Sequence, residues 1–227
     1  MSLLIKICGL RTPEALDVAL ESGADMVGFV FFAPSPRHIG LPAARELGQR
    51  VRGRAKKVAL TVDATDEMLF DIVEALRPDM LQLHGNETPE RVATVRSRFG
   101  LPVMKALPIE RRSDLSPIRL YAKVADRILF DARAPQNATR PGGLGKPFDW
   151  TLLKDIDPEI PFMLSGGLDA RNVAKALRIT HAPAVDVSSG VERKPGEKDL
   201  DKIRAFVRAA RQTDVMDLGA ANLVDRA

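Results

Sequence analysis

Eight short apolar runs recur along the chain, each as long as a typical β-strand and several of them rich in Val, Ile or Phe. They cover residues 3–8, 26–32, 58–62, 80–84, 102–107, 127–132, 161–165 and 184–188. Longer segments with apolar residues at helical spacing lie between several of them. Thr12, Thr65 and Thr88 open three of these segments, and each is predicted to be a helix N-cap because its hydroxyl can accept a hydrogen bond from a free first-turn amide. This alternation predicts parallel strands joined by crossover connections.

Eight such units within 227 residues predict a single (β/α)8 barrel domain that spans residues 1–227. An open, doubly wound parallel sheet is the structural alternative. Residues 212–227 follow the last helical pattern, and we expect them to form a C-terminal extension that is either frayed or packed.

Polar residues occupy alternate positions in several of the strand-like runs, and side chains alternate between the two faces of a strand. Because parallel sheets are usually covered on both faces, we expect this polar set to point into the barrel near the carboxyl ends of the strands, where barrel active sites lie. The set consists of Lys6, Cys8, Thr61, Asp63, Gln82, His84, Lys105, Asp131, Asp186 and Ser188.

Three glycine-containing loops follow the sixth, seventh and eighth runs. Their key residues are Gly142, Gly143, Gly166, Gly167, Ser188, Ser189 and Gly190. Glycine allows backbone N–H groups to approach an anion closely, and barrels often hold a phosphate at the loops after strands seven and eight. Turn formation alone would explain one such loop, but three at adjacent strand ends predict a phosphate-binding site.

Four side chains near strand ends carry candidate chemistry. Cys8 could act as a base or nucleophile, although a lone cysteine is more often a small core residue. Asp131 could donate a proton, or it could be an ion-pair partner of Lys6 or Lys105. Arg37 could bind a carboxylate or phosphate with two parallel hydrogen bonds. His84 could contact substrate or serve as a hydrogen-bonded core histidine.

Composition narrows the remaining choices. One cysteine cannot form an internal disulfide, and the three histidines match no zinc-binding spacing, so we predict no metal. The net charge of +4 would attract an anionic substrate but gives little support to nucleic-acid binding. Uncharged stretches are too short to span a membrane, and Lys6 interrupts the first apolar run before a signal-peptide core forms. We therefore expect a cytoplasmic protein with a reduced thiol.

Seven motifs in this order resemble phosphoribosylanthranilate isomerase, an enzyme family of tryptophan biosynthesis, from about residue 3 to about residue 208. They are Lys6-Ile7-Cys8-Gly9, Ser35-Pro36-Arg37, Leu81-Gln82-Leu83-His84-Gly85, Phe130-Asp131, the loop from Gly142 to Trp150, Leu164-Ser165-Gly166-Gly167-Leu168, and Asp186-Val187-Ser188-Ser189-Gly190-Val191-Glu192. Each motif is short, and the specificity comes from the ordered set.

The resemblance implies a TIM barrel that isomerises N-(5'-phosphoribosyl)anthranilate to 1-(2-carboxyphenylamino)-1-deoxyribulose 5-phosphate, an Amadori rearrangement without a cofactor. It also implies that Cys8 is the general base, that Asp131 is the general acid, and that Arg37 contacts the anthranilate carboxylate. The glycine loops then match the phosphate site. Leu144 stands where the family commonly has threonine, and Pro147 is also less usual there, so a side-chain hydroxyl contact from that loop is not expected.

Other functions remain open at this point. A related barrel isomerase that acts on a histidine precursor generally uses an aspartate where Cys8 stands. The cysteine therefore disfavours that activity, and it also disfavours a bifunctional relative that acts on both substrates. A non-catalytic phosphosugar-binding module would keep the glycine loops without needing Cys8 and Asp131. A nucleic-acid binder is favoured only by the basic isoelectric point. We thus expect the protein to bind a small-molecule phosphosugar and neither nucleic acid nor a membrane. We expect it to be a monomer or a homodimer.

Overall fold

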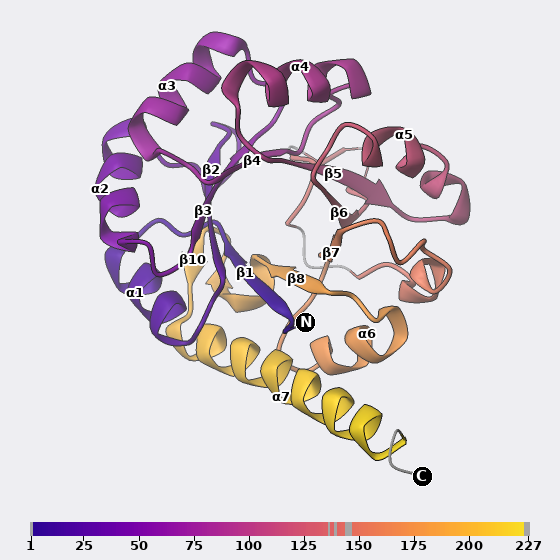
Figure 1. Cartoon of the computed structure of the whole chain (residues 1–227). Helices are drawn as coiled ribbons and strands as arrows, with labels where there is room; N and C mark the ends of the chain where they lie inside the picture. The colour runs from indigo at the N-terminus through magenta and orange to yellow at the C-terminus, as the bar shows by residue number, and fades with distance from the viewer. Residues whose placement is uncertain (1, 136, 139, 144–146, 225–227) are drawn as a thin grey trace.

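Eight parallel strands close into a barrel in which each strand pairs with the next along the chain and the eighth pairs with the first. The computed structural model describes residues 2–135, 137, 138, 140–143 and 147–224, with side chains through residue 213. The strands are β1 (Leu4–Cys8), β2 (Met26–Phe31), β3 (Lys56–Thr61), β4 (Met80–Leu83), β5 (Val103–Ile109), β6 (Arg127–Ala132), β7 (Phe162–Leu164) and β8 (Ala184–Val187). The closed ring confirms the predicted (β/α)8 fold and excludes the open sheet (Figure 1).

Helices surround this ring. They are α1 (Pro13–Glu21), α2 (Leu41–Val51), α3 (Asp66–Leu76), α4 (Pro89–Phe99), α5 (Ile118–Ala122), α6 (Val173–Thr180) and α7 (Leu200–Val224), with the 3-10 turns η1 (Arg112–Leu115), η2 (Trp150–Leu153) and η3 (Ser189–Val191). Thr12, Thr65 and Thr88 cap α1, α3 and α4 as predicted, each accepting a hydrogen bond from an amide three residues later.

Apolar side chains fill the amino-terminal half of the barrel interior. This cluster consists of Met26, Val58, Met80, Met104, Ala106, Leu129, Met163 and Ala184, all of them buried. The opposite faces of the strands carry residues such as Ile5, Ile7 and Phe130, which join the larger core beneath the helices. Because the amino-terminal end is packed, the cavity that could hold a ligand lies at the carboxyl ends of the strands.

The predicted direction of three polar side chains is wrong. On β3 the interior positions belong to Val58 and Leu60, so Thr61 and Asp63 are not part of the inward set. Lys105 lies among outward positions of β5, where its ammonium pairs with Glu87 at 2.7 Å. An outward position beneath a helix can hold a polar group if a partner satisfies it, so alternation alone does not say which face is inside.

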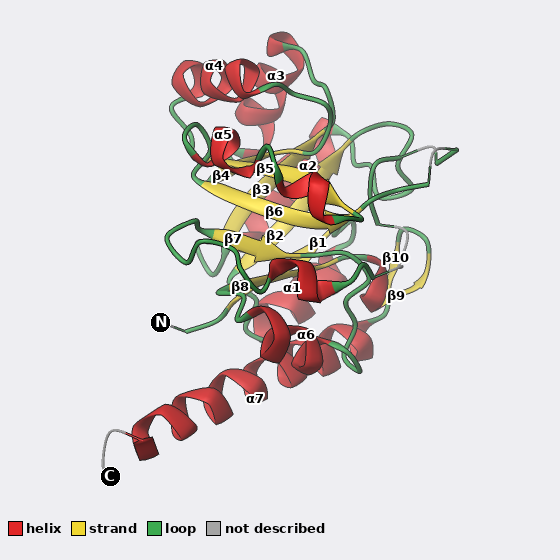
Figure 2. Ribbon diagram, turned by 90° about the vertical axis from the view of Figure 1, so that its right-hand side faces the viewer, coloured by secondary structure: helices red, strands yellow, loops and turns green. Residues whose placement is uncertain are grey.

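The chain after β8 departs from a simple helix return. Strands β9 (Glu192–Lys194) and β10 (Glu197–Lys198) form a short antiparallel hairpin before α7 begins. Figure 2 shows this hairpin at the same end of the barrel as the loops that follow the main strands. Residues 212–224, predicted as an extension, continue α7, which runs beyond the barrel.

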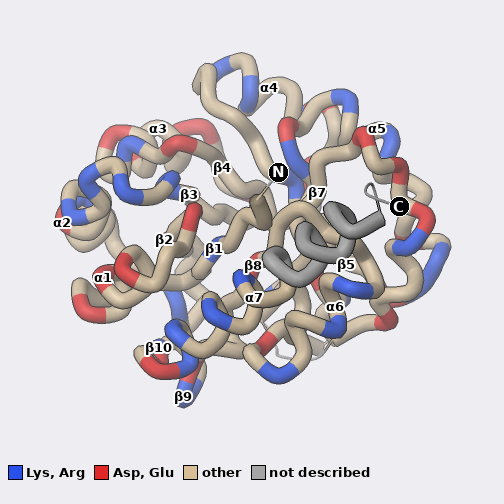
Figure 3. Tube along the Cα trace, turned by 60° about the horizontal axis from the view of Figure 1, so that its bottom comes forward, with Lys and Arg blue, Asp and Glu red and all other residues tan. Residues whose placement is uncertain are grey.

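Charged residues are mixed on the outside of the barrel. Figure 3 shows Lys and Arg interspersed with Asp and Glu along the outer helices. No helix within the described residues is long and apolar enough to cross a membrane.

Candidate active site

All eight strands or the residues just after them contribute to one cavity of about 950 Å³ at the carboxyl end of the barrel. Ten of the eleven predicted site residues line it: Cys8, Arg37, His84, Asp131, Gly142, Gly143, Gly166, Gly167, Ser188 and Ser189. Gly190 is not in the lining, because it packs behind the wall. These ten predicted site residues therefore converge on one pocket large enough for a phosphosugar with an aromatic substituent.

Cys8 ends β1 with its side chain turned inward and 3% exposed. It pairs in register with Gly28 on β2, where a Cβ atom would lie only 2.9 Å from the Cys8 Sγ. The missing side chain at Gly28 thus leaves the space that the thiol occupies. Burial raises the pKa of Cys8, and the nearby ammonium of Lys6 opposes that rise. The thiol is a general-base candidate whose ionisation depends on its charged neighbours.

Lys6 is fully buried one layer below the thiol. Its Nζ donates to Asp186 Oδ1 at 2.9 Å, and Ser165 Oγ donates to the other Asp186 oxygen at 3.0 Å. Burial disfavours the charge on Lys6, but the Asp186 carboxylate raises the pKa of Lys6 above its ordinary value. Asp131 is consequently not the ion-pair partner of Lys6 or of Lys105.

Asp131 near the end of β6 contacts His84 instead. The His84 Nε2 and Asp131 Oδ2 atoms are 3.2 Å apart, and the Ala132 amide donates to Asp131 Oδ1 at 2.9 Å. Gln82 Nε2 lies 3.0 Å from His84 Nδ1. Because an amide nitrogen can only donate, Nδ1 accepts this hydrogen bond, and in a neutral imidazole ring the proton is then on Nε2, which faces Asp131. Both carboxyl oxygens of Asp131 are therefore oriented by donors, and the group faces the same cavity as Cys8.

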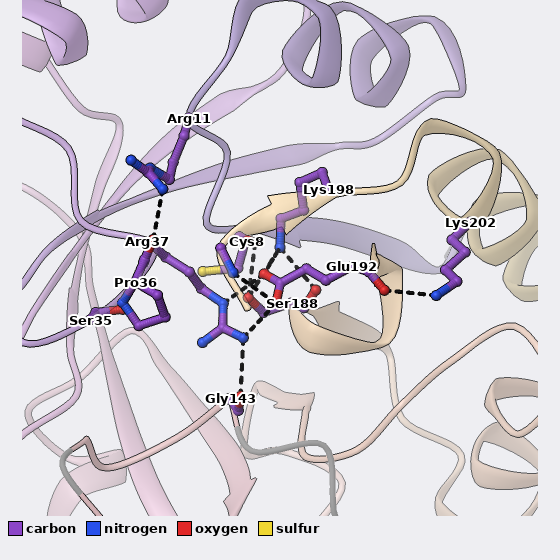
Figure 4. A network of polar contacts seen from close by, with 11 residues as sticks. Cys8, Arg11, Ser35, Pro36, Arg37, Gly143, Ser188, Glu192, Lys198 and Lys202 are labelled. Atoms are coloured by element: carbon purple, nitrogen blue, oxygen red, sulfur yellow. Dashed lines mark hydrogen bonds and ion pairs between the residues drawn. The ribbon is translucent and has the colours of Figure 1, made fainter. Parts of the chain in front are cut away.

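Arg37 is 4% exposed and is not an ordinary surface arginine. Its Nε and Nη2 each donate to a different oxygen of Glu192 at 2.8 Å, and Nη2 also donates to the Gly143 carbonyl at 3.1 Å (Figure 4). Although burial favours a neutral acid, Arg37 and Lys198 hold the pKa of Glu192 below its usual value. The Glu192 carboxylate fixes one edge of the guanidinium, and Nη1 has no hydrogen-bond partner among the described residues. Because Arg37 lines the cavity, this nitrogen is available to contact an anionic group there.

The glycine loops divide into two groups. Gly142 and Gly143 lie beside Asp131 and Arg37, since Cβ atoms on them would lie 2.3 Å from Asp131 Oδ2 and 2.4 Å from Arg37 Nη1. The loops after β7 and β8 pack on each other, because a Cβ on Gly190 would lie 1.9 Å from the Leu168 carbonyl oxygen. Leu144 lies outside the described residues.

The sequence patterns predict no role for two further charged residues beside the site, Glu192 and Lys198. Both are charged residues that the hairpin returns to the end of β1, a fold-back that neither strand nor helix periodicity indicates. Among the described residues, no group of three or more His, Cys, Asp and Glu side chains could hold a metal ion.

Comparison with known proteins now identifies the family. The family model for N-(5'phosphoribosyl)anthranilate (PRA) isomerase matches residues 5–209. The chain belongs to this family. A relative from Bradyrhizobium sp. (strain ORS 278) named N-(5'-phosphoribosyl)anthranilate isomerase is 64% identical over 218 residues, which is 96% of this chain and 100% of the relative.

Solved structures of the same family superpose on the barrel. Phosphoribosylanthranilate isomerase from Thermotoga maritima has a TM-score of 0.84 and 34% identity, covering 92% of this chain and 99% of that one. A second phosphoribosylanthranilate isomerase structure, in complex with reduced 1-(o-carboxyphenylamino)-1-deoxyribulose 5-phosphate, has a TM-score of 0.81 and 32% identity over the same shares. The predicted family, the barrel and the isomerase activity in tryptophan biosynthesis are confirmed.

Proposed function

We propose that Cys8 and Asp131 are the general base and general acid by which this phosphoribosylanthranilate isomerase converts N-(5'-phosphoribosyl)anthranilate to 1-(2-carboxyphenylamino)-1-deoxyribulose 5-phosphate. The observation that carries the proposal is that one cavity joins an inward thiol on β1 to an oriented carboxyl group on β6. A structural cysteine would not need an open cavity beside it.

The substrate would be held at both ends. Its phosphate would lie at Gly166, Gly167, Ser188 and Ser189, where the β7 and β8 loops meet in the cavity wall. Gly190 would support this site by allowing the two loops to touch. Arg37 would receive the anthranilate carboxylate with its Nη1, while Gly142, Gly143 and His84 would enclose the reacting carbons. Binding energy from the two anionic ends would position the sugar for proton transfer.

The chemistry then requires two proton transfers. Asp131, protonated, donates its proton to the ribose ring oxygen while the C1'–O bond breaks and a Schiff base forms. Cys8, as thiolate, removes the C2' proton, and the electron pair of that C–H bond neutralises the iminium nitrogen. The resulting enolamine tautomerises to the ketone. Each transfer can contribute about 10²–10⁴-fold to the rate, and the reaction as written uses no cofactor.

A turnover assay tests the proposal against a non-catalytic phosphosugar-binding module. Addition of N-(5'-phosphoribosyl)anthranilate to the purified protein should change anthranilate-type fluorescence at a rate proportional to protein concentration. Binding without turnover would contradict the proposal. Because catalysis needs a free thiol, we also propose that the enzyme works in the reducing cytoplasm. Its oligomeric state stays a prediction of monomer or homodimer.

A further inference from the structure

The Cys8 thiol shares its space with a buried ammonium group. A Cβ on Gly28 would lie 2.9 Å from Cys8 Sγ and 3.1 Å from Lys6 Nζ, so both atoms sit over the same glycine. Lys6 is fully buried, and its carboxylate partner Asp186 extends from β8. This pair places one positive and one negative charge directly below the thiol.

A second buried lysine reaches the same strand end from the β9–β10 hairpin. Lys198 Nζ donates to Glu192 Oε1 at 2.8 Å and to the Ser188 carbonyl at 2.9 Å. The Ser188 hydroxyl, 3.3 Å from the same ammonium, donates to the Cys8 carbonyl at 3.1 Å. Figure 4 shows the side chains of Lys198, Glu192 and Cys8 close to one another. The hairpin therefore brings a charge to Cys8 that no strand of the barrel supplies.

The charged groups of this cluster carry a net positive charge while the thiol is neutral. Lys6, Lys198 and Arg37 are cationic, and Asp186 and Glu192 are the carboxylates that pair with them. One positive charge is therefore left over while Cys8 is neutral, and a thiolate would cancel it. An uncompensated charge is costly in a buried site of low dielectric constant.

The remaining charged groups around the thiol do not reverse this balance. Asp186 opposes ionisation of Cys8, while Lys6 and Lys198 favour it. Burial lowers the pKa of Lys198, and the Glu192 carboxylate opposes that effect. Arg140 adds positive charge near Arg37 and Glu192. The other charged pair of the site joins Asp131 on β6 to His84, which follows β4.

We propose that Lys198, together with Lys6, stabilises the thiolate, proton-accepting form of Cys8 against the cost of its burial, which makes Lys198 a positioning residue for the isomerisation. The inference rests on the proposed function of Cys8 as the base. Glu192 binds both Lys198 and Arg37. The β9–β10 hairpin would therefore both orient Arg37 toward the substrate carboxylate and stabilise the Cys8 thiolate.

Thiol titration tests this inference directly, because Cys8 is the only cysteine and thiolate absorbance reports it alone. Lys198→Met should move the titration midpoint upward by about 1 pH unit or more. The acid limb of kcat/KM should move by the same amount. Lys202→Met is the matched control, because this substitution also removes one positive charge. Lys202 is exposed on α7 and donates to the Glu192 carbonyl. It should leave the midpoint unchanged.

Two further variants separate charge from packing. Lys198→Gln keeps hydrogen-bond donors toward Glu192 and Ser188 without the charge, and it should titrate like Lys198→Met. Lys198→Arg keeps the charge and should return the midpoint toward that of the unaltered protein. A folded Lys198→Gln variant with an unshifted midpoint would overturn the inference. The titration needs no substrate, so it decides this inference separately from the proposed function, which full turnover in Cys8→Ser would overturn.

Discussion

Arg37 illustrates how single residues in this site depend on partners far away in the sequence. Its guanidinium, which lines the cavity, is held by two hydrogen bonds to Glu192 and one to Gly143. An arginine fixed this way loses little side-chain entropy when it binds a carboxylate. Its proposed task is therefore recognition of the anthranilate end.

Arg37→Ala should raise KM by about 10- to 100-fold, the loss expected for a charge-assisted hydrogen bond. Steady-state kinetics measures this, with Arg11→Ala as the matched control. Arg11 donates to the carbonyl of Pro36, the residue before Arg37, but does not line the cavity. The KM of the Arg11→Ala variant should therefore stay unchanged. An unchanged KM in Arg37→Ala would reject the carboxylate assignment.

Cys8 should also set a pH dependence. Burial raises the pKa of its thiol, and a general base must be deprotonated, so kcat/KM should rise with pH as the thiolate fraction grows. Rate measurements across the neutral range would reveal this limb, and Cys8→Ser should remove it. A profile that is level from acid to alkaline pH would show that the thiol does not limit the reaction.

The β7 and β8 loops form the element on which the proposed phosphate binding depends. Gly166 has a φ of +84°, and a Cβ there would lie 2.5 Å from the Ala132 backbone nitrogen. Gly190 allows a still closer approach to the Leu168 carbonyl. These glycines bring β6, β7 and β8 loops together so that their backbone can surround one anion.

Gly190→Ala should therefore weaken binding of the substrate about tenfold or more, because the added methyl group must separate the two loops. KM and calorimetric binding of inorganic phosphate would both report the change. Gly40→Ala makes a suitable control, since its Cβ would meet nothing closer than 3.7 Å. Equal phosphate affinity in the Gly190→Ala variant would place the phosphate elsewhere.

Strand and helix order was predictable from the sequence because each element repeats a simple pattern. Strand alternation predicted correctly that the side chains of His84 and Asp131 face the cavity, but the same rule gave the wrong face for other polar residues. Lys105 shows the limit, since a lysine paired to Glu87 beneath a helix has the same alternation as one inside the barrel. The roles of Glu192 and Lys198 depend on a hairpin that folds back on β1, a tertiary contact without a periodic signal.

At the scale of the whole molecule, the net charge of +4 favours encounter with an anionic substrate. The outer helices mix both signs (Figure 3), so the attraction should be modest and local to the cavity, where Arg37 and Arg140 line the wall. kcat/KM should decrease as salt increases, with kcat nearly constant, because ions screen the approach but not the bound complex. Salt-independent kcat/KM would show that the charge plays no part in association.

If a thiol and a carboxyl group act across one pocket, turnover in single variants reveals it most directly. Cys8→Ser and Asp131→Asn should each lose about 10²-fold or more in kcat, as expected when a general base or acid is removed. The fluorescence assay measures the rates, and circular dichroism with phosphate binding verifies that both variants remain folded. Near-normal turnover in either folded variant would contradict the assignment of that residue.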